Sequence, residues 1–267
     1  MERDPSPESA PLAREPNFII AGAARSGTTA FYYCLDQHPD IFMSKPSVPE
    51  SKFFVYPEEF KRGKEYLLAV RYQNIGNQKA VGEKTTHYMN CEGVPGRIFS
   101  CFPDMKFIFL LRDPVERAIS NYWWSVKNGL ETLPLPDAMD GEGERVARYE
   151  GKWKVIQPFS YKLRGFYLRY IREYLKFYPR RNLLFLITEE FETNPQPVLN
   201  QAFDFLGVAR TTKLEFIRTN EAPRFKETDP AIIRHLSGVF HDSNQELEDF
   251  LGRKIDGWLK SPAKVSV

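Results

Sequence analysis

Residues Phe18 to Tyr32 read FIIAGAARSGTTAFY, and this stretch decides which fold the chain can adopt. Four largely apolar residues lead into Gly22, a short polar loop follows, and an apolar helical pattern begins at Ala30. This order predicts a buried strand, a tight turn and the start of a helix. Backbone N–H groups at a helix start lack partners and carry partial positive charge, so the turn is suited to binding phosphate.

The polar loop itself carries anion-binding groups. Gly22 and Gly27 let the backbone approach an anion closely, while hydroxyl groups and the Arg25 guanidinium add donors and a fixed charge. The alternative is an ordinary glycine-bearing turn between a strand and a helix. The candidate phosphate-binding residues are Ala24, Arg25, Ser26, Gly27, Thr28 and Thr29.

The loop differs from a nucleoside-triphosphate loop at one position. The spacing from Gly22 to Gly27 fits the pattern G-x-x-x-x-G-K-[ST], but Thr28 stands where that pattern has lysine. That lysine reaches the β- and γ-phosphates. The sequence therefore favours a single phosphate with a cation at its rim over a triphosphate.

Further apolar runs predict buried strands at 41–43, near 80–84, at 105–111 and at 183–187. The run ending at Leu111 is continuously apolar, as is typical of a parallel strand buried on both faces. We therefore expect an α/β fold with a parallel sheet. Residues 128–150 show little periodicity and predict an irregular insertion or lid. Helical patterns are expected at 58–70, 115–127, 160–178, 196–206, 230–241 and 243–251.

Chemistry-bearing residues follow the ends of these predicted strands. Pro46 and Pro49 exclude a regular element before Glu50, which makes this carboxylate a candidate general base on a constrained loop. The alternative is a surface glutamate that caps the next helix. Lys84 and His87 follow the strand near 80–84, where ligands bind in open α/β sheets, although a lone histidine is more often structural.

A second anion site is predicted after residue 111. Arg112 ends the strand and Ser120 projects from the adjoining helix, while arginine is the preferred partner for phosphate oxygens. The alternative is that Arg112 pairs with a nearby carboxylate. A later loop carries two cations around an aromatic ring, which could clamp a nucleotide or belong to a solvated loop. Its candidates are Arg224, Phe225 and Lys226.

Composition limits the other partners. The net charge of +2 over 267 residues gives no broad field for nucleic acid or a membrane surface. The three cysteines fit no zinc or disulfide pattern, so we expect reduced thiols, a cytoplasmic location and no metal site. Residues 1–16 are polar and proline-rich and predict a disordered segment, followed by a single domain over 17–267.

Taken together, the motifs resemble the sulfotransferases that use 3′-phosphoadenosine 5′-phosphosulfate (PAPS), and most of all the branch with heparan sulfate 3-O- and N-sulfotransferase domains. The loop after residue 22 resembles that family's 5′-phosphosulfate loop, with Arg25 at the usual lysine. The segment Arg112–Ser120 matches its R-D-P-x-x-R-x-x-S pattern for the 3′-phosphate. Other matches are Glu50-Ser51-Lys52-Phe53-Phe54, Glu83–Tyr88 and Glu189–Gly207.

The resemblance implies a P-loop-like three-layer fold, with the central parallel sheet flanked by helices, and in-line sulfuryl transfer. PAPS would be the donor and 3′-phosphoadenosine 5′-phosphate (PAP) the product, without a metal. The acceptor would be a hydroxyl or amine of a small molecule or carbohydrate. Glu50 would be the general base, with His87 as second candidate, and Arg25 and Lys84 would stabilise the developing charge.

The departures from the heparan branch indicate a bacterial cytoplasmic member, because neither its membrane anchor nor its disulfide can be found in this sequence. Two other functions remain open at this point. One is a P-loop nucleotide kinase, against which the missing lysine argues, and the other is a non-catalytic nucleotide- or glycan-binding module. The sequence predicts neither the acceptor nor the oligomeric state.

Overall fold

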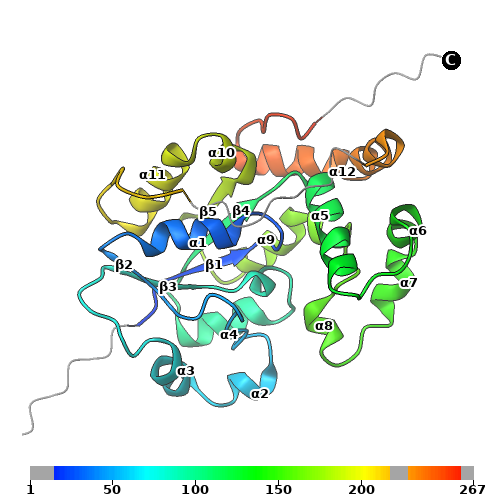
Figure 1. Ribbon diagram of the computed structural model, residues 1–267. Coiled ribbons are helices and arrows are strands. Elements are labelled where there is room, and N and C mark those ends of the chain that lie inside the picture. The colour runs from blue at the N-terminus through cyan, green and yellow to red at the C-terminus, as the bar shows by residue number, and fades with distance from the viewer. Residues whose placement is uncertain (1–14, 217–227, 260–267) are drawn as a thin grey trace, which may run out of the picture.

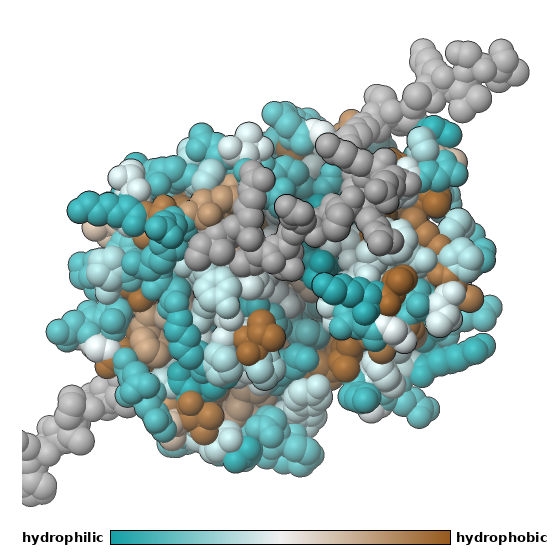
Figure 2. Space-filling view, in the orientation of Figure 1, coloured by the Kyte–Doolittle hydropathy of each residue, from teal (hydrophilic) through white to brown (hydrophobic). Residues whose placement is uncertain are grey.

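The computed structural model describes residues 15–216 and 228–259. The predicted disordered segment 1–16 lies almost wholly outside the described residues. So do Arg224, Phe225 and Lys226, which therefore remain predictions. On the face shown in Figure 2 the surface is mostly hydrophilic, with hydrophobic residues in small separate groups.

A five-stranded parallel sheet, in the order β2-β3-β1-β4-β5, forms the centre of the fold. The predicted α/β architecture with a parallel sheet is thus confirmed. Gly82 of β3 stands opposite Phe18 of β1, and a Cβ atom there would lie 2.5 Å from the Phe18 ring. The strands are β1 (Phe18–Gly22), β2 (Ile41–Met43), β3 (Ala80–Lys84), β4 (Lys106–Leu111) and β5 (Leu183–Ile187).

Helices cover both faces of the sheet and make the three layers (Figure 1). One face packs on α1 (Thr28–Asp36), α10 (Thr188–Thr193) and α11 (Pro195–Leu206). The other packs on residues of α3, α4, α9 and α12, with the pair Phe53 and Phe54. Alternate residues of β1 enter opposite clusters, because successive strand side chains point to opposite faces. These helices are α3 (Lys64–Arg71), α4 (Val94–Cys101), α9 (Tyr167–Leu175) and α12 (Pro230–Leu251).

A third hydrophobic cluster lies beside the sheet. It joins α5 (Pro114–Lys127) to α6 (Leu135–Asp140) and to the first half of α12. Figure 1 shows α6 and α7 beside α5, away from the strands. The remaining short helices are α2 (Pro57–Phe60), α7 (Glu142–Ala147), α8 (Trp153–Ile156) and the 3₁₀ turns Thr86–Met89, Leu163–Gly165 and Arg180–Asn182.

The expected irregular insertion at 128–150 was wrong, because α6 and α7 lie within it. A polar cluster around the buried carboxylate of Glu131 anchors α7: Glu131 accepts two hydrogen bonds from Arg145 and one from the Tyr161 hydroxyl at 2.5 Å. Such long-range partners leave no periodic pattern in the sequence.

Several helix predictions also had wrong limits. The helix expected at 58–70 is two helices, α2 and α3, separated by a turn at residues 61–63. The helix expected at 160–178 begins at Tyr167, after the 3₁₀ turn Leu163–Gly165. Gly165 lies so close to α5 and α12 that a Cβ atom would be 2.9 Å from Pro114 and 2.7 Å from Phe240. The two helices expected at 230–241 and 243–251 are one continuous helix, α12, and Asn244 is buried within it.

Candidate active site

The loop between β1 and α1 forms an open helix start. Gly27 is the N-cap residue of α1, with a φ of 72°, and no side chain caps the helix. The Ser26 hydroxyl is buried without a hydrogen-bond partner, while its carbonyl accepts from Thr188 at 3.0 Å. An orphaned buried hydroxyl beside uncapped backbone N–H groups fits a phosphate group at this helix start.

The positively charged side chain of Arg25 extends from this loop toward α5. Its backbone has a φ of 71°, the left-handed region that costs a residue with a Cβ atom about 1 kcal/mol. The Nε atom donates to the Ser120 hydroxyl at 3.2 Å. Burial and then the charge of Arg112 lower the pKa of Arg25, so two cations face each other here. An anion between them would relieve the repulsion.

Arg112 pairs with a carboxylate and also lies beside the phosphate loop. Its guanidinium pairs with Glu116 at 2.8 Å, so the predicted alternative of a carboxylate partner is present. It also donates to the Arg25 carbonyl at 3.4 Å, which places it beside the loop. Arg25, Arg112 and Ser120, predicted from segments about 95 residues apart, thus meet in one place.

Glu50 is the centre of a second cluster and does not cap α2, the next helix in the chain. Its carboxylate accepts from the Thr86 backbone N–H at 3.0 Å and from the Thr86 hydroxyl at 3.1 Å. His87 Nδ1 lies 3.1 Å away, and Lys84 Nζ lies 3.2 Å away. The carboxylate therefore has a partner for each of its oxygens, and its side chain is only 12% exposed.

The titration of this cluster follows from its charges. Burial would raise the pKa of Glu50, but the hydrogen bond from His87 and the charge of Lys84 outweigh it and lower the pKa to about 2. Burial lowers the pKa of His87, against the opposing effect of the Glu50 hydrogen bond. At neutral pH the arrangement is an ionised carboxylate that orients a neutral imidazole.

Lys84 joins the two clusters. Its Nζ donates to the Thr29 hydroxyl at 3.2 Å, at the start of α1, and pairs with Glu50 on the other side. The side chain is 3% exposed. The cation consequently lies between the predicted phosphate loop and the predicted base, where charge on a transferred group would develop.

Sequence reasoning missed several residues that hold the site together. Glu116 was overlooked as the partner of Arg112, although its i,i+4 spacing on a helix could have indicated the pair. Glu189 accepts from the Asp113 N–H, and Tyr167 donates to the Arg112 carbonyl. These two contacts come from distant elements and have no local signal.

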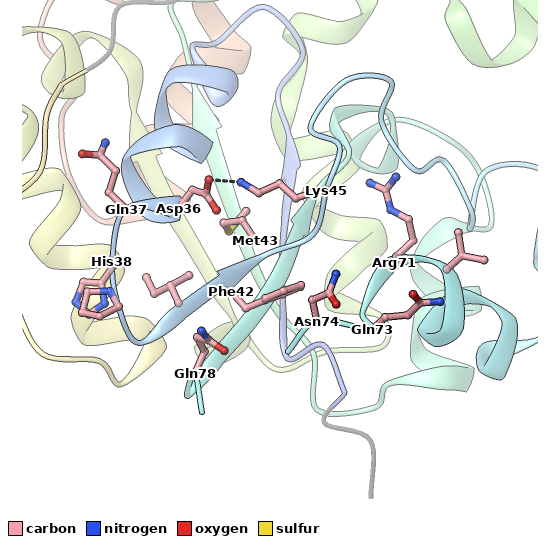
Figure 3. A pocket seen from close by; sticks show the side chains of 13 residues that line it. Asp36, Gln37, His38, Phe42, Met43, Lys45, Arg71, Gln73, Asn74 and Gln78 are labelled. Atoms are coloured by element: carbon pink, nitrogen blue, oxygen red, sulfur yellow. Dashed lines mark hydrogen bonds and ion pairs between the residues drawn. The ribbon is translucent and has the colours of Figure 1, made fainter. Parts of the chain in front are cut away.

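A cavity of about 490 Å³ borders the edge strand β2 and includes none of the predicted site residues. Figure 3 shows it between the end of α1, β2 and the end of α3, with Lys45 paired to Asp36. Lys45 begins the loop that runs on to Glu50. The cavity is separate from the candidate site, although this loop connects the two in sequence.

Within 15–216 and 228–259, no group of three or more His, Cys, Asp or Glu side chains could hold a metal ion. In the same ranges, no helix combines the length and apolar character needed to cross a membrane.

The chain matches the family model described as the sulfotransferase domain over residues 15–238. Heparan sulfate glucosamine 3-O-sulfotransferase 3B1 of Homo sapiens is 27% identical over 226 residues, which cover 84% of this chain and 55% of the relative. The bifunctional heparan sulfate N-deacetylase/N-sulfotransferase 2 of Homo sapiens is 25% identical and is covered over 31% of its length. The chain thus spans about half, or less, of the length of these curated relatives.

Solved structures agree with this assignment. A sulfotransferase from Alicyclobacillus acidocaldarius is 26% identical, with a TM-score of 0.79, and the match covers 92% of this chain and 100% of that one. Mouse sulfotransferase SULT7A1, solved as a complex with PAP, shares the fold at 16% identity and a TM-score of 0.54, covering 89% of this chain and 87% of that chain. The predicted P-loop-like fold is confirmed, and the chain belongs to the sulfotransferase family, whose members use PAPS.

Proposed function

We propose that this chain transfers a sulfuryl group from PAPS to a hydroxyl or amine of a small-molecule or carbohydrate acceptor. The observation that carries the proposal is the meeting of three predicted elements at the carboxyl ends of β1, β3 and β4. The phosphate loop, the Arg112–Ser120 pair and the Glu50–Lys84–His87 cluster are joined by hydrogen bonds through Arg25 and Lys84.

The nucleotide contacts follow from the chemistry of each group. Backbone N–H groups and hydroxyls from Ala24 to Thr29 bind the 5′-phosphate. Arg112 and Ser120 bind the 3′-phosphate, which ATP lacks. PAPS supplies an activated sulfuryl group and leaves as PAP. Further contacts from Arg224, Phe225 and Lys226 remain part of the proposal on sequence grounds alone.

The geometry favours His87 over Glu50 as the group that removes the acceptor proton, the reverse of the order expected from sequence. A carboxylate with a pKa of about 2 is a weak base. With Nδ1–H donating to Glu50, the basic atom of His87 is Nε2, which takes the proton while the carboxylate stabilises the resulting imidazolium. Arg25 and Lys84 then stabilise negative charge on the transferred group and on the leaving phosphate.

Calorimetric titration with PAP tests this proposal, with ADP and Mg-ATP as controls. We expect tight binding of PAP that requires the 3′-phosphate and weakens at least tenfold in Arg112→Ala. Preference for Mg-ATP would overturn the proposal in favour of a kinase. Binding of PAP without sulfuryl transfer to any acceptor in a screen of sugars and phenols would overturn it in favour of a non-catalytic binding module.

The proposal also includes a cytoplasmic location and no metal requirement. The first is supported by three cysteines that are free thiols in the structure. The second is supported by the loop threonine at position 28 in place of the lysine of metal-dependent triphosphate loops. Activity that survives a chelator, and protein recovered in the cytoplasmic fraction, are the expected results.

A further inference from the structure

The peptide unit between Arg112 and Asp113 is held at both of its polar atoms. β4 ends at Leu111 and α5 begins at Pro114, so these two residues are the whole connection. The Arg112 carbonyl accepts from the Tyr167 hydroxyl at 2.7 Å, and the Asp113 N–H donates to Glu189 Oε1 at 2.8 Å. Two side chains from different helices therefore fix the plane of one peptide bond.

A third side chain closes the arrangement. Trp258 Nε1 donates to Glu189 Oε2 at 3.3 Å, and the Trp258 ring lies 6.0 Å from the Tyr167 ring. Tyr167 is 1% exposed and Trp258 is 5% exposed, so neither moves freely. Tyr167 begins α9, Glu189 lies on α10, and Trp258 follows α12 in the chain.

The peptide needs such support because Arg112 and Arg25 repel each other. Their proximity lowers the pKa of Arg25, after the larger effect of burial. Arg112 is retained by Glu116, whose side chain is 25% exposed, and by the Arg25 carbonyl at the long distance of 3.4 Å. A free rotation of the Arg112–Asp113 peptide would let the guanidinium move away from the second cation.

We propose that Glu189, Tyr167 and Trp258 form a peptide clamp that positions Arg112 for the nucleotide 3′-phosphate and so determines selectivity for that phosphate. The inference rests on the proposed function. The three are positioning residues, because they act on the Arg112–Asp113 peptide and through it on the guanidinium.

The test removes one hydrogen bond at a time. Tyr167→Phe deletes the donor to the Arg112 carbonyl and keeps the ring. Glu189→Gln keeps one acceptor oxygen, but its NH₂ group then faces either the Asp113 N–H or the Trp258 N–H. Titration of each variant with PAP and with ADP compares nucleotides that carry the same number of phosphates, of which only PAP has one at the 3′ position.

Two matched controls separate the clamp from general destabilisation. Glu190→Gln changes the neighbouring carboxylate, which pairs with Arg253 at the surface. Tyr178→Phe removes an equally buried hydroxyl, which donates to the Phe102 carbonyl at 3.0 Å. Both controls should bind PAP and ADP as the unmodified protein does, and thermal unfolding verifies that every variant is folded at the titration temperature.

We expect Tyr167→Phe and Glu189→Gln to weaken PAP binding about five- to twentyfold and ADP binding less than twofold. Equal losses for both nucleotides, or no loss for either, would overturn the clamp alone. If the unmodified protein bound PAP and ADP equally, the proposed function and the clamp would fall together. Trp258→Phe removes the donor to Glu189 and supplies a milder variant, which should shift the ratio of PAP affinity to ADP affinity in the same direction.

Discussion

Glu50 and Glu189 are partly buried glutamates near the carboxyl ends of the strands, and the pKa values of their carboxyl groups are shifted in opposite directions. Glu50, on the β2–β3 side, has a pKa of about 2. Glu189, on the β4–β5 side, has a pKa of about 7, because burial and the Asp113 charge outweigh the hydrogen bonds it accepts. Glu50 contacts two cationic or protonatable groups, whereas Glu189 accepts from neutral N–H groups.

The difference shows that partners, rather than burial, decide what a carboxylate can do here. Glu50 is kept as an anion and can stabilise a charge that forms on His87. Glu189, with a pKa of about 7, is only partly ionised at physiological pH, and its two oxygens accept hydrogen bonds from the Asp113 backbone N–H and the Trp258 ring. The proposed chemistry thus lies on one side of the phosphate loop, and the proposed support for the nucleotide lies on the other.

The largest expected effect is on turnover. His87→Ala removes the proposed base and should lower kcat about a thousandfold, with PAP affinity unchanged within twofold. Glu50→Gln retains His87 and should lower kcat only about tenfold to a hundredfold. Steady-state kinetics and calorimetry measure both. A greater loss in Glu50→Gln than in His87→Ala would return the role of base to Glu50.

The pH dependence of kcat/KM distinguishes the same two groups. A base must be unprotonated, so activity should fall about tenfold per pH unit below the pKa of His87, which burial holds below its usual 6.5. Were Glu50 the base, with a pKa of about 2, activity would stay constant from pH 7 down to the limit of folding. Circular dichroism at each pH shows that the protein is folded.

Stability should respond to pH in opposite ways at the two glutamates. The ionised carboxylate of Glu50 stabilises the fold fully above pH 4.5, its ordinary pKa, and this contribution is lost as the pH falls through about 2. The contribution of Glu189 is present below pH 4.5 and is lost as pH rises through 7. Each shift corresponds to about 3 kcal/mol.

Denaturant unfolding at pH 5 and pH 8 checks this contrast. The free energy of unfolding of Glu189→Gln, relative to that of the unmodified protein, should increase as pH rises from 5 to 8. The unmodified protein loses stability over this interval as Glu189 ionises, and the variant has no carboxyl at this position. Glu50→Gln should show a deficit that is constant over this interval. Identical pH profiles for the two variants would contradict the opposite shifts.

The smallest expected effect concerns Thr86. Thr86→Val removes the hydroxyl that donates to Glu50 but keeps the backbone N–H contact. We expect a loss of about 1 kcal/mol in the free energy of unfolding and a decrease in kcat of only a few fold. An unchanged unfolding free energy would mean that the Glu50 oxygens are satisfied without this hydroxyl.

The order of elements could be predicted from sequence because it depends on local pattern. Continuous apolar runs predicted the parallel strands, and the loop after Gly22 predicted an open helix start. The candidate residues of that loop, with Arg112 and Ser120, also meet in the structure. The limits of helices were less predictable, because they depend on packing against distant residues. Gly165 packs closely on Pro114 and Phe240 just before α9 begins, and α12 continues through residues where two helices were expected.

By itself, the sequence determined the strand–turn–helix unit around residues 18–32 and the position of polar groups at the ends of strands, because alternation and strand-end chemistry are local properties. Only the tertiary structure decided which groups pair. Whether Glu50 meets Lys84 and His87, or Glu189 meets the Asp113 N–H, depends on how the strands align in the sheet. Those contacts set the charge of each carboxylate, and hence its role, since electrostatic interactions act through space over distances that the chain order does not reveal.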